Sequence, residues 1–366
     1  MATRKRVIYQ SEAVYVGPSP ATGFNFTSGN SGDNLISQLH RVQSANYSFN
    51  VSRQDINQYG QLAAIDRVIL QAPTVALDFS YYLTNGVNEK RLGLNIDGAL
   101  SAISGLLNGT QDEKNYYIST SPEGTDNVGA NAAAREVFAI GNGFLSNYSI
   151  EAAVGGLPTA SVSVEALNIK VDPTAAGNPT PAVNPEDGLA IAGVNYSLPV
   201  AVAGVPGQIS ALRPGDITVD VQTPFGAKVS GEGKAHFQNV SIQVPLSREP
   251  LERLGSKFAF SREIQYPLTV TFNATANLAD LQSGNLSNIL CNDENYDLQL
   301  TLREPSCSGV GPIAMIYQLK GAKLDSQSFS SSIGSNKSVD LTWSAQIGGP
   351  QDTTKGLFIS GSYVGS

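Results

Sequence analysis

The chain has 366 residues, 41% of them hydrophobic, which suffices for two globular domains of roughly 150 residues each. Only 15% are charged, and the net charge of −8 argues against phosphate binding as the main activity, because neutralising phosphates needs Lys and Arg on one face. The same negative balance suits a surface that must not adhere to DNA.

Targeting signals are not evident. Met1 to Gln10 contains three basic residues, but no apolar run follows them, so we expect no signal peptide. The longest apolar stretch, Leu198 to Val205, is interrupted by Pro199 and Gly204 and falls short of the ~20 residues of a membrane helix. We therefore expect a soluble protein made in a cytoplasm, with no membrane partner.

Alternation of apolar and polar residues predicts antiparallel strands with one face on a core. In chain order the apolar stripes are Tyr47–Phe49–Val51, Val75–Leu77–Phe79–Tyr81, Val240–Ile242–Val244–Leu246, Leu268–Val270–Phe272, Leu298–Leu300–Leu302 and Val339–Leu341–Trp343–Ala345–Ile347. Helix is sparse. Asp97 is predicted to cap a short helix over Gly98 to Leu107, with a counterpart near Leu286 to Leu290.

An internal repeat organises these strands. Gln43 to Leu70 aligns with Gln238 to Gln265 at a constant offset of 195, with seven of 28 positions identical. Further matches follow in the same order, among them Asn115-Tyr116 with Asn295-Tyr296 and Leu145 with Leu324. Two unrelated β domains would not keep such an order, so we infer a tandem duplication.

The repeat divides the chain. We predict a first β domain over 1–171, a linker or arm over 172–214 and a second β domain over 215–366, each domain a sandwich or barrel with one short flanking helix. Seven prolines in 172–214 favour a semi-rigid segment. Its apolar part, 188–205, is expected to pack on a domain or on a neighbouring subunit.

No reactive constellation emerges from the residue types. His40 and His236 have no ligand partner at metal spacing, and the Asp293, Glu294 and Asp297 cluster favours a solvated loop. Gly231–Lys234 and Gly309–Gly311 lack the spacing of phosphate loops and are predicted turns. We therefore predict no catalytic, cofactor or metal residues, and no enzyme.

The two cysteines, Cys291 and Cys307, do not form a disulfide framework. Reduced thiols are favoured over a single bridge between them.

The charged positions of most interest are Arg53 and Arg248, which follow Ser and precede a turn glycine in both copies. Each arginine could simply cover the end of a strand. Alternatively, each could form an ion pair across a subunit contact, where the planar guanidinium is favoured. We take Arg53, Arg248, Gly60 and Gly255 as candidate subunit-interface residues.

Three segments resemble the major tail proteins of tailed bacteriophages. They are Val14–Gly23 with Leu39–Ser44, the block Asn46–Gly60, and Phe144–Ser149 continuing through Ser161–Glu165. The resemblance covers the first copy well and reaches the second mainly through the repeat. Its motifs are structural patterns without a chemical signature.

The resemblance implies tail-tube-like domains, six of which close into a ring whose inner strands form a continuous barrel. With two domains in one chain, three chains would complete a ring, and stacked rings would form the tube through which DNA leaves the capsid. Expected partners are further copies of the chain and the tape measure, terminator and tail-tip proteins, with DNA passing through unbound. The expected location is the virion tail, assembled in the host cytoplasm.

A second function remains open at this point. The surface rich in Asn, Ser, Thr and Gly, together with 14 tyrosines, would also suit a carbohydrate- or receptor-binding β-sandwich protein of the tail tip or fibre. Such a module should expose an aromatic cluster in one copy only, whereas a ring former should keep equivalent interface positions in both.

Overall fold

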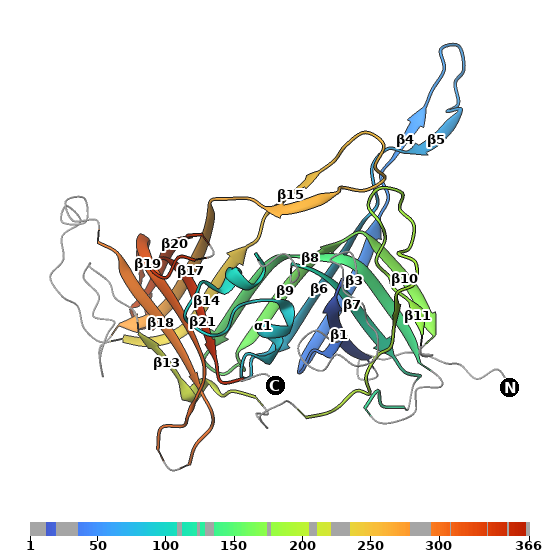
Figure 1. Cartoon of the computed structure of the whole chain (residues 1–366). Helices are drawn as coiled ribbons and strands as arrows, with labels where there is room; N and C mark the ends of the chain where they lie inside the picture. The colour runs from blue at the N-terminus through green and yellow to red at the C-terminus, as the bar shows by residue number, and fades with distance from the viewer. Residues whose placement is uncertain are drawn as a thin grey trace.

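The structure is a computed structural model of the whole chain (Figure 1). It describes residues 12–19, 36–107, 112–122, 125–128, 135–173, 177–204, 211–220, 235–278, 294–307, 309–334, 336–349 and 351–363. We refer to residues up to 204 as the first half and to those from 211 onward as the second half. The fold is mostly β, as the alternating pattern predicts, and most strands belong to one antiparallel sheet.

The described residues of the first half form twelve strands and one α-helix. They are β1 (Glu12–Pro18), β2 (Ser37–Gln38), β3 (Val42–Asn50), β4 (Arg53–Ile56), β5 (Asp66–Ile69), β6 (Thr74–Tyr82), α1 (Val87–Leu92), β7 (Glu113–Thr120), β8 (Glu136–Ala153), β9 (Thr159–Ala166), β10 (Asn168–Pro173), β11 (Asn178–Pro179) and β12 (Asn195–Tyr196).

The second half contains nine described strands. They are β13 (Ile217–Asp220), β14 (Ala235–Pro245), β15 (Arg248–Leu251), β16 (Ser261–Ile264), β17 (Leu268–Leu278), β18 (Tyr296–Arg303), β19 (Ile313–Ser330), β20 (Ser338–Ile347) and β21 (Gly356–Gly361).

The two halves pair their strands in the same order. In the first half β3 pairs β6, β6 pairs β9, β9 pairs β8, and β8 pairs both β7 and β10. In the second half β14, β17, β20, β19, β18 and β21 take the places of β3, β6, β9, β8, β7 and β10. The hairpins β4–β5 and β15–β16 also lie at matching positions, 195 residues apart.

Irregularities of the sheet are repeated as well. A bulge separates Leu145 from Asn147 in β8, and the same bulge separates Leu324 from Ser326 in β19. Earlier in β8, the backbone N–H of Asn142 (φ 54°) donates to the Asn115 side chain at 3.1 Å. In β19 the N–H of Gly321 (φ 67°) donates to Asp297 at 3.1 Å in the same way.

This geometry corrects one detail of the sequence alignment. Tyr116 lies opposite Ile140, and Leu298 lies opposite Leu319, so the equivalent of Asn115 is Asp297 and not Asn295. The Asn-Tyr match is therefore a coincidence displaced by two residues, and the equivalent of Asp112 is Glu294. Hydrogen bonding at the bulge, and not residue identity, sets the register here.

One apolar cluster runs through both halves. It joins the inward stripes of β6, β8 and β9 with those of β14, β17, β19 and β20. Trp343, in the strand with the clearest alternation, is fully buried and packs edge-on against Phe272 at 5.8 Å between ring centroids. Burial on this scale is the main stabilising contribution to such a fold, and here the two halves share it.

Helical structure differs from the prediction. Asp97 accepts hydrogen bonds from the N–H groups of Ala99 and Leu100, but the helical turn is a short 3-10 segment at Ala102–Gly105. Gly98 has φ of 74°, a left-handed conformation that interrupts a right-handed helix after Asp97. The α-helix of this half is α1, at 87–92, and the expected counterpart near 286–290 lies outside the described residues.

Within the described part of the chain, no helix is long and apolar enough to cross a membrane.

Candidate functional site

The seam between the halves is a pair of antiparallel strands. The second half of β8 pairs with β14, from Asn147 opposite Pro245 to Ala153 opposite Asn239. Ile150 and Ile242 face each other in the core and are 2% and 1% exposed. The backbone N–H groups of Leu246 and Val154 extend the ladder at either end. The seam thus continues one sheet from the first half into the second.

Two strand edges match this seam but have no partner strand among the described residues. β3 pairs only with β6, on one side. The second half of β19, Lys323 to Ser330, pairs only with β20, on one side. β3 is the equivalent of β14, and β19 is the equivalent of β8. The open edge of β3 therefore corresponds to one side of the seam and the open edge of β19 to the other, and the two edges lie at opposite ends of the sheet.

The open edges expose apolar side chains. Phe49 in β3 is 67% exposed and Phe329 in β19 is 39% exposed, whereas their counterparts at the seam, Val244 and Ile150, are both 2% exposed. A long strand edge with exposed aromatic residues and unpaired backbone groups readily pairs with another chain unless it is covered. These edges are the strongest candidate for a functional surface of the protein.

The solvent-facing side of the same sheet is uniformly polar. Its outward positions are almost all Ser, Thr, Asn or Gln. The charged ones on β6, β8, β9 and β20 include Asp78, Glu151, Glu165 and Asp340, and β19 adds one cation, Lys323, opposite Ser344. Many hydrogen-bond across strands, for example Thr275 to Asp340 at 2.8 Å and Asn239 to Glu151 at 3.2 Å. No Lys or Arg occurs in β3, β6, β8, β9, β14, β17 or β20.

The predicted interface residue Arg248 lies in the second half and contacts the first. Its guanidinium donates to both carboxylate oxygens of Asp112, at 2.8 and 2.5 Å, and to the carbonyl oxygen of Leu145 at 2.8 Å. It also lies over the Phe144 ring, and its side chain is only 1% exposed. Arg262 reinforces the contact through a 2.8 Å ion pair with Glu165. The hairpin β15–β16 is thereby fixed over the first half.

The other predicted interface arginine, Arg53, is exposed at the base of hairpin β4–β5, and no polar contact of its side chain occurs among the described residues. Gly60 (φ 87°) and Gly255 (φ 92°) turn the two hairpins, and each has open space around it. Their left-handed backbone explains the repeated glycine. The structure therefore does not bring the four residues together, and their role between subunits stays a prediction.

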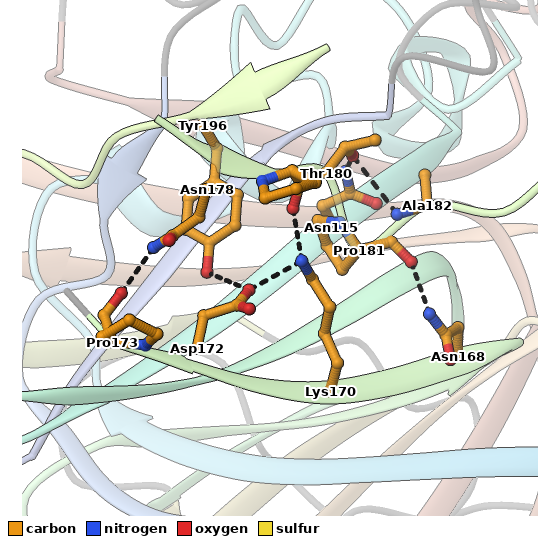
Figure 2. A network of polar contacts seen from close by, with 11 residues as sticks. Asn115, Asn168, Lys170, Asp172, Pro173, Asn178, Thr180, Pro181, Ala182 and Tyr196 are labelled. Atoms are coloured by element: carbon orange, nitrogen blue, oxygen red, sulfur yellow. Dashed lines mark hydrogen bonds and ion pairs between the residues drawn. The ribbon is translucent and has the colours of Figure 1, made fainter. Parts of the chain in front are cut away.

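The segment expected as a linker packs on the outside of the first half. Tyr196 lies beside Tyr117, with ring centroids 4.6 Å apart, and joins a second apolar cluster with Tyr15 and Val137. Figure 2 shows the polar contacts beneath it, in which the Tyr196 hydroxyl and the Lys170 ammonium both reach Asp172, at 2.9 and 2.7 Å. The segment therefore packs against the first half of its own chain.

A buried polar cluster lies where the halves meet. Glu89 of α1 accepts hydrogen bonds from Tyr81 at 2.9 Å and Tyr148 at 3.2 Å, and Tyr148 contacts the hydroxyl of Tyr317 at 2.9 Å. Burial raises the pKa of the Glu89 carboxyl, and no cation contacts it among the residues that the structure describes. Sequence patterns gave no signal for this cluster, because a single Glu and scattered tyrosines have no motif.

The remaining candidates for chemistry are dispersed. His40 is buried, its backbone N–H bonds Asn88 at 2.9 Å, and burial together with Arg91 and Arg41 lowers its pKa to about 4. His236 lies exposed on β14. Within the described ranges no group of His, Cys, Asp and Glu could hold a metal.

Several predicted loops fall partly outside the structure. Cys307 is free and exposed, whereas Cys291, Asp293 and Gly231–Lys234 lie outside the described residues. Gly311 lies in the turn between β18 and β19, as expected of a hairpin connection. Glu294 and Asp297 are exposed as expected, but Asp297 lies in β18 and not in a loop, and it accepts a hydrogen bond from the Gly321 N–H.

Comparison with known proteins gives no family. No family model matches the chain, and no curated protein matches it.

Proposed function

We propose that this protein is a structural subunit that polymerises into closed rings, the major tail tube protein of a tailed bacteriophage. Three chains, each contributing two equivalent halves, would form a ring, and stacked rings would form a conduit for DNA. The tandem arrangement of domains belongs to this proposal, and the repeated strand pairing and bulges support it.

The observation that carries the proposal is the match between the internal seam and the two open edges. Extending the seam's register to two molecules places β3 of one chain beside β19 of the next. Tyr47 would lie opposite Phe329, as Ile242 lies opposite Ile150, and Ser48 would lie opposite Ser328. A head-to-tail contact of this kind closes into a ring when its rotation divides a full turn, and closure removes the exposed edges.

The polar face supports the role of a conduit. A wall of hydroxyl and amide groups with acidic and no basic residues on seven of its strands, and a single Lys323 on β19, offers few counterions to a phosphate backbone. DNA would pass such a wall without binding to it. The further partners proposed are the tape measure, terminator and tail-tip proteins, and the proposed location is the virion tail.

The alternative of a glycan- or receptor-binding module finds no specific support. Exposed aromatic residues occur in both halves, with Phe49 and Tyr59 in the first and Phe260 and Phe329 in the second. They do not gather in one copy, as a binding module would require.

A register-specific disulfide tests the proposal. In the seam, Leu246 bonds Ser146 and Val154 bonds Gln238, so Gln243 opposite Ser149 is a pair without mutual hydrogen bonds, in which Cα atoms lie about 4.5 Å apart. Ser48 and Ser328 are the equivalent pair. In a background of Cys291→Ser and Cys307→Ser, Ser48→Cys with Ser328→Cys should oxidise to a covalent trimer.

The control pairs Ser48→Cys with Gln327→Cys, which face opposite sides of the sheet and should not crosslink. Negative-stain images should show rings or tubes with threefold symmetry. A protein that remains monomeric at high concentration and gives no crosslink would refute the proposal.

A further inference from the structure

The two hairpins that follow β3 and β14 have the same sequence pattern but different surroundings. Hairpin β15–β16 leans across from the second half and lies over the first, whereas hairpin β4–β5 projects away from the rest of the molecule (Figure 1). Their strands correspond residue by residue, Arg53–Ile56 with Arg248–Leu251 and Asp66–Ile69 with Ser261–Ile264. Each hairpin therefore serves as a control for the other.

Burial differs most at the base of the hairpins. The side chains of Arg248 and Arg262 are 1% and 8% exposed, whereas that of Arg67, the equivalent of Arg262, is 69% exposed. Ile264 is 9% exposed and its equivalent Ile69 is 52% exposed. Hairpin β4–β5 thus has the same residue types at its base as hairpin β15–β16, but no surface of its own chain covers them among the described residues.

The seat of the bound hairpin has a described counterpart in the second half. Arg248 binds Asp112 and the carbonyl of Leu145, and Arg262 binds Glu165. The strand registers identify their equivalents as Glu294, Leu324 and Ser344. Glu294 is exposed and Ser344 is half-buried, so this second seat is open, and it carries an anion for Arg53.

We propose that the β4–β5 hairpin docks on the second half of another copy of this chain. Arg53 pairs with Glu294 and donates to the Leu324 carbonyl, and the base of the hairpin, with Arg67 and Ile69, covers the second part of β20 around Ser344. The partner is a second copy because a chain with two hairpins and two seats can satisfy only one pair internally. This inference rests on the proposed function and adds a second contact to each junction between chains.

The second seat differs from the first at one position. Lys323 takes the place of Phe144, which in the first seat supports the Arg248 guanidinium from below. A cation there repels Arg53, so the Glu294 carboxylate has to balance two positive groups. We therefore expect the contact to depend on charge more strongly than its internal counterpart does, and to weaken with salt.

A charge exchange tests the contact. Arg53→Glu and Glu294→Arg should each raise the concentration needed for assembly at least tenfold, because each places like charges opposite one another. The double variant should recover most of this loss. Arg213→Glu, at an exposed arginine outside the hairpins, is the control and should assemble normally. Light scattering and sedimentation measure assembly, and circular dichroism of the unassembled variants verifies folding.

Hydrogen exchange gives a second readout. Amides of 66–69 should become protected on assembly of the wild-type protein and stay exchangeable in Arg53→Glu. If the Ser48–Ser328 disulfide forms but both charge variants assemble normally and 66–69 stay exchangeable, the docking is wrong while the ring stands. If the protein stays monomeric without the disulfide, both proposals fail.

Discussion

Hairpins β4–β5 and β15–β16 share a sequence pattern, a turn glycine and a base arginine, yet one is buried at its base and the other stands free. The difference does not arise from the hairpins themselves. In the proposed tandem arrangement the chain has one junction between its halves, so the hairpin of the second half docks inside the molecule. The hairpin of the first half and the second docking site lie at the two ends, where we propose that another molecule joins them.

The strands at the edge of the sheet show the same difference between the two halves. β14 is covered by β8, and its equivalent β3 is open. In the proposed ring each contact inside the chain has an equivalent contact between chains, and paired substitutions test how far this equivalence extends.

The largest effect is expected at the seam. Ile242→Asp places an ionisable group in the shared core, where Ile242 is 1% exposed, and should lower the free energy of unfolding by about 4 kcal/mol or more. Tyr47→Asp, at the equivalent but half-buried position, should cost the isolated chain far less and should abolish assembly. Urea unfolding followed by Trp343 fluorescence measures the first effect. Equal losses at both positions would contradict the comparison.

The next largest effect is a difference in stability between variants of the two arginines. Arg248→Ala leaves the Asp112 carboxylate without its partner and should destabilise the isolated chain by about 3 kcal/mol. Arg53→Ala, at an exposed site, should change stability by less than about 0.5 kcal/mol. Arg248 forms its ion pair with Asp112 within its own chain, so the role between subunits that we expected of both arginines remains a prediction for Arg53. Thermal unfolding of both variants below the assembly concentration decides the point.

A pH effect is expected where the repeat breaks down. Tyr148 bonds both Glu89 and Tyr317, whereas the equivalents of the two tyrosines are Gln327 and Phe138, so the described part of the second half has no matching cluster. Burial raises the pKa of Glu89 above 4.5. Its contribution to stability is therefore complete below pH 4.5 and is lost as the pH rises through the higher folded-state pKa.

Glu89→Gln stays neutral and removes this loss. The stability difference between Glu89→Gln and wild type should therefore be small near pH 4.5 and should grow in favour of the variant toward neutral pH. Urea midpoints measured from pH 4 to 8 give this difference. A constant offset across the range would show that Glu89 does not titrate in this way.

The smallest effects should be equal in the two hairpins. Gly60→Ala and Gly255→Ala each force a side chain into a left-handed backbone at a site with open space, at a cost of about 1 kcal/mol. Matched losses in the isolated chain would show that both turns are set locally. A much larger loss at Gly255 would mean that its turn is coupled to docking of the hairpin.

The sequence by itself determined the strands and their repetition. Alternation along β14, β17 and β20 predicts which side chains enter the core, because a strand presents successive residues to opposite faces. The offset of 195 residues likewise predicted the matching hairpins. These are local properties, readable from neighbouring residues.

The tertiary structure alone decided the partners. Sequence could not assign Asp112 to Arg248 or bring Tyr148 to Glu89 and Tyr317, because these residues are far apart in the chain and have no fixed spacing. It also misplaced the register at Asn115, because only the strand pairing shows that Asp297 is the equivalent residue, and it extended a helix past Gly98. A strand shows which of its faces is apolar, but which strand lies at its edge depends on how the whole chain closes.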